Sequence, residues 1–196
     1  MYRFAPAWSA KPLLCVFESN LFSEDELKKI VKVGDALKPE PATSFDEDKN
    51  AYQVSDYRKC KVSVYDLLPE TQFVYDRLAE FITAKNEESF GFDLCGFAEK
   101  FQYLVYDKTN DHYDWHIDLS YGNQPNRKLT LVVQLSDPSE YEGGELQLKI
   151  TEKPLVTTKK FGMVYLFPSF IMHRVTPITK GVRKSLVVWA NGEAFR

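Results

Sequence analysis

Residues 113–118 place a histidine and an aspartate two positions apart, at His116 and Asp118. On a strand, two such side chains project from the same face, with Cα atoms about 6.6 Å apart. Metal bonds to imidazole nitrogen or carboxylate oxygen measure about 2.0–2.2 Å, so both side chains can reach one ion. Because the chain holds 3 histidines and 28 acidic residues, chance matches to His-x-Asp are frequent, and the pair needs support from elsewhere.

His173 lies far downstream and is the candidate third ligand. Two histidines and one carboxylate on one face of a metal leave open coordination positions, which is typical of non-haem Fe(II) oxygenase sites. We therefore predict that His116, Asp118 and His173 are the iron ligands and form the catalytic centre.

Arg183 and Ser185 share one face of a further predicted strand. A guanidinium group among apolar neighbours is costly to bury without a counter-charge. Its planar fork suits bidentate binding of a carboxylate, and the Ser185 hydroxyl can add a donor. Beside an iron site, this pair predicts a small dicarboxylate cosubstrate that chelates the metal through its other end.

These residues lie in a region of short strands separated by turn residues such as Gly143 and Gly144. Strands are predicted over 98–106, 112–118, 128–136, 145–150, 162–167, 172–178 and 183–190. Their number and spacing indicate a β-sandwich or jelly roll.

Two of these strands predict which face of the sheet lines the site. In one, Leu129, Leu131, Val133 and Leu135 share a face, and Thr130, Val132 and Gln134 share the other. In the second, the set Arg183, Ser185, Val187 and Trp189 alternates with Lys184, Leu186, Val188 and Ala190. Strands that are apolar on both faces are covered on both sides. The mixed face is expected to line a cavity.

The first half of the chain predicts elements that support this sheet. A strand is expected over 12–17, and Ser23 with Glu26 forms a capping-box pattern before a helix over 24–37. Residues 38–52 are predicted to be a loop, followed by a strand over 61–64 and a helix over 69–85. We expect both helices on the outer face of the major sheet. The chain then divides into a support region, 1–96, and a catalytic core, 97–196, within one compact domain.

Composition excludes several classes of protein. The net charge is −3 and residues 58–61 are the densest basic cluster, so phosphate-driven nucleic-acid binding is not favoured. Cys15, Cys60 and Cys95 are odd in number and widely spaced, which indicates neither a disulfide framework nor a zinc ribbon. We expect a cytoplasmic protein without a membrane span.

The order His116-x-Asp118, His173, Arg183-x-Ser185 resembles the Fe(II)/2-oxoglutarate-dependent dioxygenases. Blocks at 127–137, 141–146, 167–169 and 173–178 narrow the resemblance to the prolyl 4-hydroxylase-like, PKHD-type branch, over about 97–192. The resemblance implies a double-stranded β-helix (jelly roll), mainly β with flanking helices.

The resemblance also implies roles by position. His116, Asp118 and His173 match the iron ligands, and Arg183 matches the residue that binds the distal carboxylate of 2-oxoglutarate. Other positions match cosubstrate contacts or pocket walls: Tyr106, Leu146 and Trp189. Gln134 stands where some prolyl hydroxylases have a tyrosine, which is a departure from the family pattern.

The implied reaction couples decarboxylation of 2-oxoglutarate, giving succinate and CO2, to hydroxylation of an aliphatic C–H. It requires Fe(II), 2-oxoglutarate and O2, with ascorbate as an optional addition. The expected substrate is a prolyl or other residue of a protein or peptide. The alternatives are hydroxylation of a free small molecule, oxidative demethylation of nucleic acid, and a non-catalytic jelly-roll binding module.

Residues around the ligands predict how the substrate is selected. Trp115 is expected to face away from the ligands, whereas Tyr113 either borders the substrate mouth or fills a gap. We expect the segment 119–127 to be a lid that orders on substrate binding.

Overall fold

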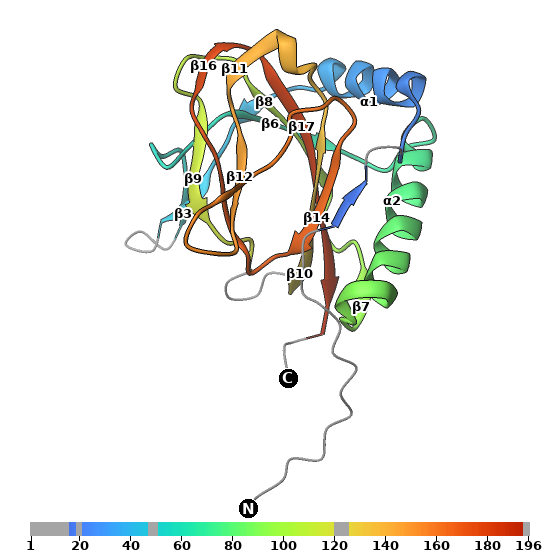
Figure 1. The fold of residues 1–196 in the computed structure, drawn as a ribbon. Helices are drawn as coiled ribbons and strands as arrows, with labels where there is room; N and C mark the ends of the chain where they lie inside the picture. The colour runs from blue at the N-terminus through green and yellow to red at the C-terminus, as the bar shows by residue number, and fades with distance from the viewer. Residues whose placement is uncertain (1–15, 19–20, 47–50, 120–125, 194–196) are drawn as a thin grey trace, which may run out of the picture.

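The computed structural model describes residues 16–18, 21–46, 51–119 and 126–193. Two sheets dominate this part of the chain (Figure 1). The major sheet has the order β1-β14-β10-β17-β8-β6-β2, with β7 paired to β17. Its strands are β1 (Val16–Glu18), β14 (Val164–Pro168), β10 (Arg127–Gln134), β17 (Arg183–Gly192), β8 (Phe101–Tyr106), β6 (Lys61–Tyr65), β2 (Glu40–Pro41) and β7 (Leu94–Gly96).

The minor sheet has the order β13-β12-β15-β9-β5 and carries His116 at the end of β9. Its strands are β13 (Leu155–Val156), β12 (Leu146–Lys149), β15 (Met172–Val175), β9 (His112–His116) and β5 (Arg58–Lys59). Two pairs complete the described strands: β3 (Ser44–Asp46) with β4 (Ala51–Gln53), and β11 (Tyr141–Gly143) with β16 (Ile178–Gly181). Single helical turns of other types occupy η1 (Asn86–Phe90) and η2 (Pro138–Glu140).

Helix α1 (Glu24–Ala36) begins where its sequence predicts. The Ser23 hydroxyl accepts a hydrogen bond from the Glu26 backbone N–H, and the Glu26 carboxylate accepts one from the Ser23 backbone N–H. This capping box satisfies two amide groups that a helix start otherwise leaves without partners. Helix α2 (Gln72–Lys85) begins later than predicted, because Pro69 lies in the turn that precedes its N-cap, Thr71.

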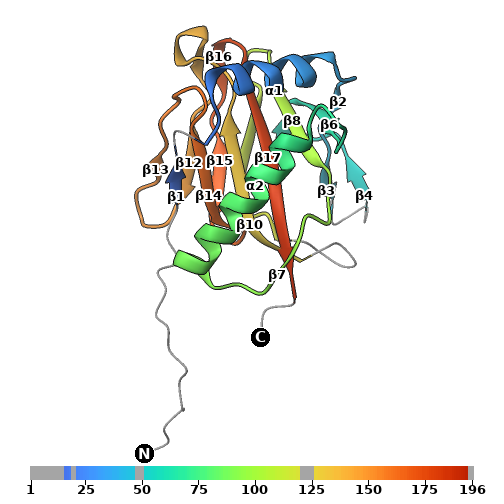
Figure 2. The ribbon, with the colours of Figure 1, turned by 90° about the vertical axis from the view of Figure 1, so that its right-hand side faces the viewer.

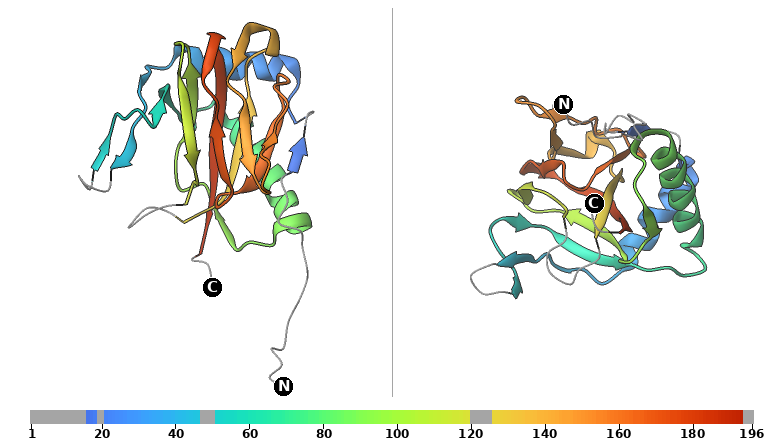
Figure 3. Two further views of the ribbon diagram at one scale, coloured as in Figure 1. Left: turned by 60° about the vertical axis from the view of Figure 1, so that its left-hand side comes forward. Right: turned by 90° about the horizontal axis from the view of Figure 1, so that it is seen from below.

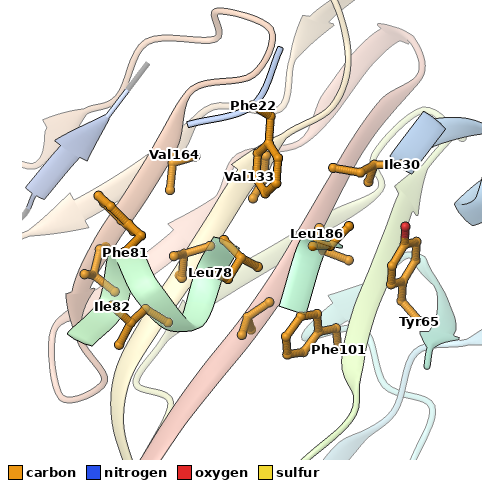
Figure 4. Packing of buried hydrophobic residues seen from close by; sticks show 14 of the residues in the cluster. Phe22, Ile30, Tyr65, Leu78, Phe81, Ile82, Phe101, Val133, Val164 and Leu186 are labelled. Atoms are coloured by element: carbon orange, nitrogen blue, oxygen red, sulfur yellow. The ribbon is translucent and has the colours of Figure 1, made fainter. Parts of the chain in front are cut away.

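Both helices pack against the major sheet, as Figure 2 shows for α2 crossing the strands. Ile30 of α1 and Leu78 of α2 belong to one buried cluster with residues of β10 and β17. Figure 4 shows this packing, with Leu78, Phe81 and Ile82 directed towards the sheet. The sheet residues in the cluster include Leu129, Leu131, Val133, Leu186 and Val188, which is the leucine-rich face predicted from the alternation.

The opposite face of the major sheet packs against the minor sheet. Val132, Val187 and Trp189 belong to a second buried cluster with Leu146 and Leu148 of β12. Figure 3 shows, from two further directions, that the helices lie outside the strands rather than between the sheets. The alternation in β10 and β17 therefore separates a helix-packed core from the space between the two sheets.

The prediction of a loop over 38–52 is wrong. The strands β2, β3 and the start of β4 fall within it. These strands have two or three residues each, so they show no period in the sequence, and β2 is set by pairing with β6. The predicted strand over 12–17 falls mostly outside the described residues, within which Val16 and Phe17 belong to β1. Among the described helices, none combines the length and apolar character needed to cross a membrane.

Candidate functional site

A cavity of about 660 Å³ opens between the two sheets. His116, Asp118 and His173 line it together with Arg183 and Ser185, so the structure brings these five predicted residues to one space. Leu146, Trp189 and Tyr106 line the same cavity. The tight turn at Gly143 and Gly144 lies beside it, and a Cβ at Gly144 would approach the Cδ of Arg183 to 3.0 Å.

His116, Asp118 and His173 each present a ligand atom within 4.8 Å of the other two. The Asp118 carboxylate lies between the histidines, with Oδ1 3.5 Å from His116 Nε2 and Oδ2 3.4 Å from His173 Nε2. His116 and His173 pair directly across β9 and β15. Asp118 lies beyond the end of β9, which is shorter than predicted, and its backbone N–H donates to the Ser169 carbonyl at 2.8 Å.

The hydrogen bonds of both histidines leave the same nitrogen available. His116 Nδ1 lies 2.7 Å from the Asp114 carbonyl oxygen, and His173 Nδ1 lies 2.9 Å from the Ile171 carbonyl oxygen. A carbonyl only accepts, so Nδ1 carries the proton in each ring and Nε2 keeps its lone pair. A hydrogen bond from the other ring nitrogen to a backbone carbonyl orients an imidazole that binds a metal.

Asp118 is oriented by two donors on one of its oxygens. Oδ2 accepts hydrogen bonds from Thr130 Oγ1 at 2.8 Å and from Trp189 Nε1 at 2.9 Å. Thr130 also lies 3.0 Å from the Ser169 hydroxyl. Because Oδ2 is held from two sides, Oδ1 is the oxygen free to bind a metal as a single ligand.

The protonation states of these groups fit metal binding. Burial and the neighbouring His173 lower the pKa of His116 to about 3, against the opposing charge of Asp118. Burial opposes ionisation of Asp118, but the adjacent imidazoles of His173 and His116 and the Trp189 hydrogen bond outweigh it and hold the pKa below its usual range. An ionised carboxylate and a neutral imidazole are the forms that bind metal.

Arg183 is 1% exposed and has no carboxylate partner among the described residues. Its Nη1 donates to Ser185 Oγ at 3.2 Å and its Nη2 donates to Gln134 Oε1 at 3.0 Å. Within the described part of the chain, the Arg183 Nε and the Tyr106 hydroxyl are buried without a hydrogen-bond partner. A buried cation without a counter-charge, beside an unpaired hydroxyl, favours binding of an anion with several oxygen atoms.

Gln134 stands apart from the other predicted site residues. Its side chain contacts Arg183 but is not part of the cavity wall, so it positions the guanidinium rather than contacting a bound molecule. At this position, where some prolyl hydroxylases have a tyrosine, the chain has an amide that accepts a hydrogen bond from Arg183.

Several residues around the cavity were not predicted as site residues. Tyr113 stacks on His116 with ring centroids 3.5 Å apart and lines the cavity. This position favours the first of its two predicted roles, a residue that borders the substrate mouth. The cations of Lys149 and Arg174 lie over the Trp115 ring, on the side of the minor sheet opposite His173, as predicted, although Trp115 also contributes to the cavity wall. Arg58 reaches the cavity from β5, and no local sequence period marks that strand. The predicted lid, 119–127, falls largely outside the described residues.

The donor set fits ferrous iron and the Arg183 end fits a dicarboxylate. Two neutral imidazoles and one carboxylate oxygen match the ligands of an iron that keeps positions open for other molecules. The buried Nε of Arg183 and the Tyr106 hydroxyl are unused donors at the other end of the same cavity.

Residues 101–191 match the family model described as the 2OG-Fe(II) oxygenase superfamily, which confirms the resemblance drawn from the sequence. The chain is similar to a PKHD-type hydroxylase of Synechococcus sp. (strain CC9902), with 37% identity over 82 residues, or 42% of this chain and 37% of that protein. It is also similar to the PKHD-type hydroxylase YbiX of Escherichia coli O157:H7 (strain EC4115 / EHEC), with 33% identity over 87 residues. The match spans 38% of that relative, so the chain covers little more than a third of either protein.

Solved structures confirm the jelly-roll fold. A Pseudomonas putida prolyl-4-hydroxylase superimposes with a TM-score of 0.71 and 16% identity, covering 92% of this chain and 93% of that chain. A Trichoplax adhaerens prolyl hydroxylase, solved with a hypoxia inducible factor oxygen degradation domain peptide fragment, gives a TM-score of 0.74 and 17% identity, covering 90% and 83%.

Proposed function

We propose that this chain, whose residues 101–191 match the 2OG-Fe(II) oxygenase superfamily, is an Fe(II)- and 2-oxoglutarate-dependent dioxygenase. Its reaction hydroxylates an aliphatic C–H of a prolyl or other residue in a protein or peptide, with release of succinate and CO2. The observation that carries the proposal is one cavity that joins the His116, Asp118 and His173 cluster to Arg183, which is buried without a carboxylate partner among the described residues.

The chain's own residues have distinct tasks in this reaction. His116, Asp118 and His173 would hold Fe(II) through Nε2, Oδ1 and Nε2. When bound, Fe(II) with 2-oxoglutarate and O2 supplies the oxidising chemistry that hydroxylates the substrate. The described residues supply three ligands, which would leave coordination positions of the metal open for these molecules.

Arg183 binds the distal carboxylate of 2-oxoglutarate, with Ser185 and Tyr106 as hydroxyl donors. Burial raises the pKa of Tyr106, so its hydroxyl keeps its proton and donates. Leu146, Val187 and Trp189 line the cavity with apolar surface, which excludes water from the bound cosubstrate.

The solved complex of a Trichoplax prolyl hydroxylase with a peptide fragment supports a peptide substrate for this chain. A free small molecule is the alternative, since the cavity of about 660 Å³ lies within the range of small-molecule sites. We further propose that residues 1–96 support the catalytic core, 97–196, and that the protein acts in the cytoplasm.

The test incubates the protein with Fe(II), 2-oxoglutarate, ascorbate and a panel of proline-bearing peptides in air. We expect succinate formation that requires both Fe(II) and 2-oxoglutarate, with a peptide that gains the mass of one oxygen atom. His112→Ala, which alters a histidine outside the cluster, should leave succinate formation intact, whereas His173→Ala should abolish it. A folded protein that forms no succinate above the His173→Ala level would overturn the proposal.

A further inference from the structure

Arg58 is a second arginine in the cavity whose charge has no acidic partner among the described residues. It projects from β5, at the edge of the minor sheet next to β9. Its guanidinium carbon lies 4.7 Å from the ring centroid of Tyr113, and the Tyr113 ring stacks on His116. One aromatic ring therefore separates the Arg58 guanidinium from a proposed iron ligand.

The Arg58 side chain is held in place but retains unused donors. Nη2 donates to Gln102 Oε1 at 3.0 Å and Nη1 donates to the Thr43 carbonyl at 3.4 Å. A guanidinium has five N–H groups, so these two bonds leave most of its donors for other partners. Nε is buried without a hydrogen-bond partner in the described part of the chain.

Arg127 is a third arginine in the same cavity, and its charge is paired with a carboxylate. It lines the cavity with Arg58 and Arg183, but it donates from Nε and Nη2 to the two oxygens of the Glu99 carboxylate. Arg58 pairs with no carboxylate in the part of the chain that the structure describes. Although burial opposes the shift, the titratable groups Cys60, Tyr113 and Tyr106 raise the pKa of the Arg58 guanidinium.

Those neighbours carry no negative charge near neutral pH. Burial raises the pKa of the Cys60 thiol, although the charge of Arg58 opposes this shift. Burial likewise raises the pKa of Tyr113 and of Tyr106. Arg58 is therefore a cation beside neutral groups.

In the proposed complex, the positive charge of Arg58 has no counter-charge. Asp118 and a 2-oxoglutarate dianion together balance a divalent iron and Arg183, and Glu99 balances Arg127. A half-buried guanidinium with free donors then favours one more anionic group in the cavity, and the fork geometry suits a carboxylate.

We propose that Arg58 is a specificity residue that binds a carboxylate of the primary substrate. This inference rests on the proposed function, because it assigns the cosubstrate carboxylate to Arg183. The carboxylate belongs either to the free end of the substrate molecule or to an acidic side chain next to the residue that is hydroxylated.

The test measures binding by calorimetry with matched acid and amide probes. One pair is N-acetyl-Gly-Pro-Gly as the free acid and as the terminal amide. A second pair is the amide-blocked peptides N-acetyl-Asp-Pro-Gly and N-acetyl-Asn-Pro-Gly. The pair that shows the preference identifies the source of the carboxylate. N-acetylproline and its amide cover a small-molecule substrate.

In the wild type, we expect the acid member of at least one pair to bind about tenfold or more tightly than its neutral partner. Arg58→Gln should reduce that ratio to near one, and Arg58→Lys should restore part of it. Lys59→Gln removes the same charge from the exposed neighbouring residue, which pairs with Asp56, and should leave the ratio unchanged. Because each ratio is taken within one variant, a partly unfolded preparation does not change it.

Equal binding of acids and amides in the wild type, or an acid preference that survives in Arg58→Gln, would overturn the inference. A wild type that binds no acid probe would do the same. The measurements are made on the metal-free protein and on the protein loaded with Zn(II) and 2-oxoglutarate. Failure of the proposed function appears separately, as an absence of cosubstrate binding to the metal-loaded protein.

Discussion

His116 and His173 are direct cross-strand partners on β9 and β15, and their ring centroids lie 4.1 Å apart. Each Nδ1 bonds to a backbone carbonyl two residues earlier in the chain, at Asp114 and Ile171. The register of the minor sheet therefore brings together two histidines that are far apart in sequence, and the local backbone selects the nitrogen that each presents.

Thr130 and Trp189 are predicted to set metal affinity through Asp118. Thr130→Val and Trp189→Phe each remove one donor to Asp118 Oδ2 and should weaken Fe(II) binding by about tenfold. Thr130→Ser keeps the hydroxyl and should bind Fe(II) nearly as well as the wild type. Anaerobic titration with Fe(II) measures the affinities. Wild-type affinity in folded Thr130→Val would show that the hydroxyl does not position the carboxylate.

Arg183→Met is predicted to separate cosubstrate binding from stability. Removing a buried cation without a counter-charge should leave the free energy of unfolding of the unliganded protein unchanged or raise it by about 1 kcal/mol. In the metal-loaded wild type, 2-oxoglutarate at 100 times its Kd should add about 2.7 kcal/mol to the free energy of unfolding. The same concentration should add nothing in Arg183→Met.

Urea unfolding of both proteins, with and without 2-oxoglutarate, measures these differences. Lys180→Met changes an exposed lysine on β16 that pairs with Glu142, and it should retain the full stabilisation by the ligand. Stabilisation of Arg183→Met by 2-oxoglutarate to the wild-type extent would contradict the assignment of Arg183.

Glu26 is predicted to make the start of α1 sensitive to acid. The hydrogen bond from the Ser23 backbone N–H lowers the pKa of Glu26 below its usual value, burial opposes this shift, and Arg77 adds to the lowering. A carboxyl group whose pKa is lower in the folded protein contributes stability that is present above the unfolded pKa and lost as the pH falls through the folded pKa. Unfolding free energies of the wild type and Glu26→Gln, measured from pH 7 to pH 3, should therefore converge as the pH falls. A difference that stays constant over this range would exclude the ionised carboxylate as its cause.

Much of the site could be predicted because its residues lie on regular strands. The alternation in β10 and β17 separates Arg183, Ser185, Val187 and Trp189 from the helix-packed face, and the structure has the same division. The capping box at Ser23 and Glu26 is likewise a local pattern, and it predicts the start of α1 correctly. Local periodicity carries this information because it does not depend on distant partners.

The substrate side of the cavity could not be predicted in the same way. Arg58 lies on a two-residue strand that exists because β5 pairs with β9, and this pairing joins residues more than fifty positions apart. The hydrogen bonds of Thr130 and Trp189 to Asp118 also depend on how β10, β17 and the segment after β9 meet in space. Such contacts follow from tertiary packing and leave no signal in a short stretch of sequence.

The most direct test of the iron and 2-oxoglutarate site is the visible spectrum of the protein after anaerobic addition of Fe(II) and then 2-oxoglutarate. We expect a metal-to-ligand charge-transfer band that requires both additions, disappears in His116→Ala and persists in His112→Ala. His112 lies on the same strand but outside the ligand cluster, so it controls for the loss of a histidine from β9. A folded, iron-loaded wild type that shows no band with 2-oxoglutarate would contradict the assignment of this cavity.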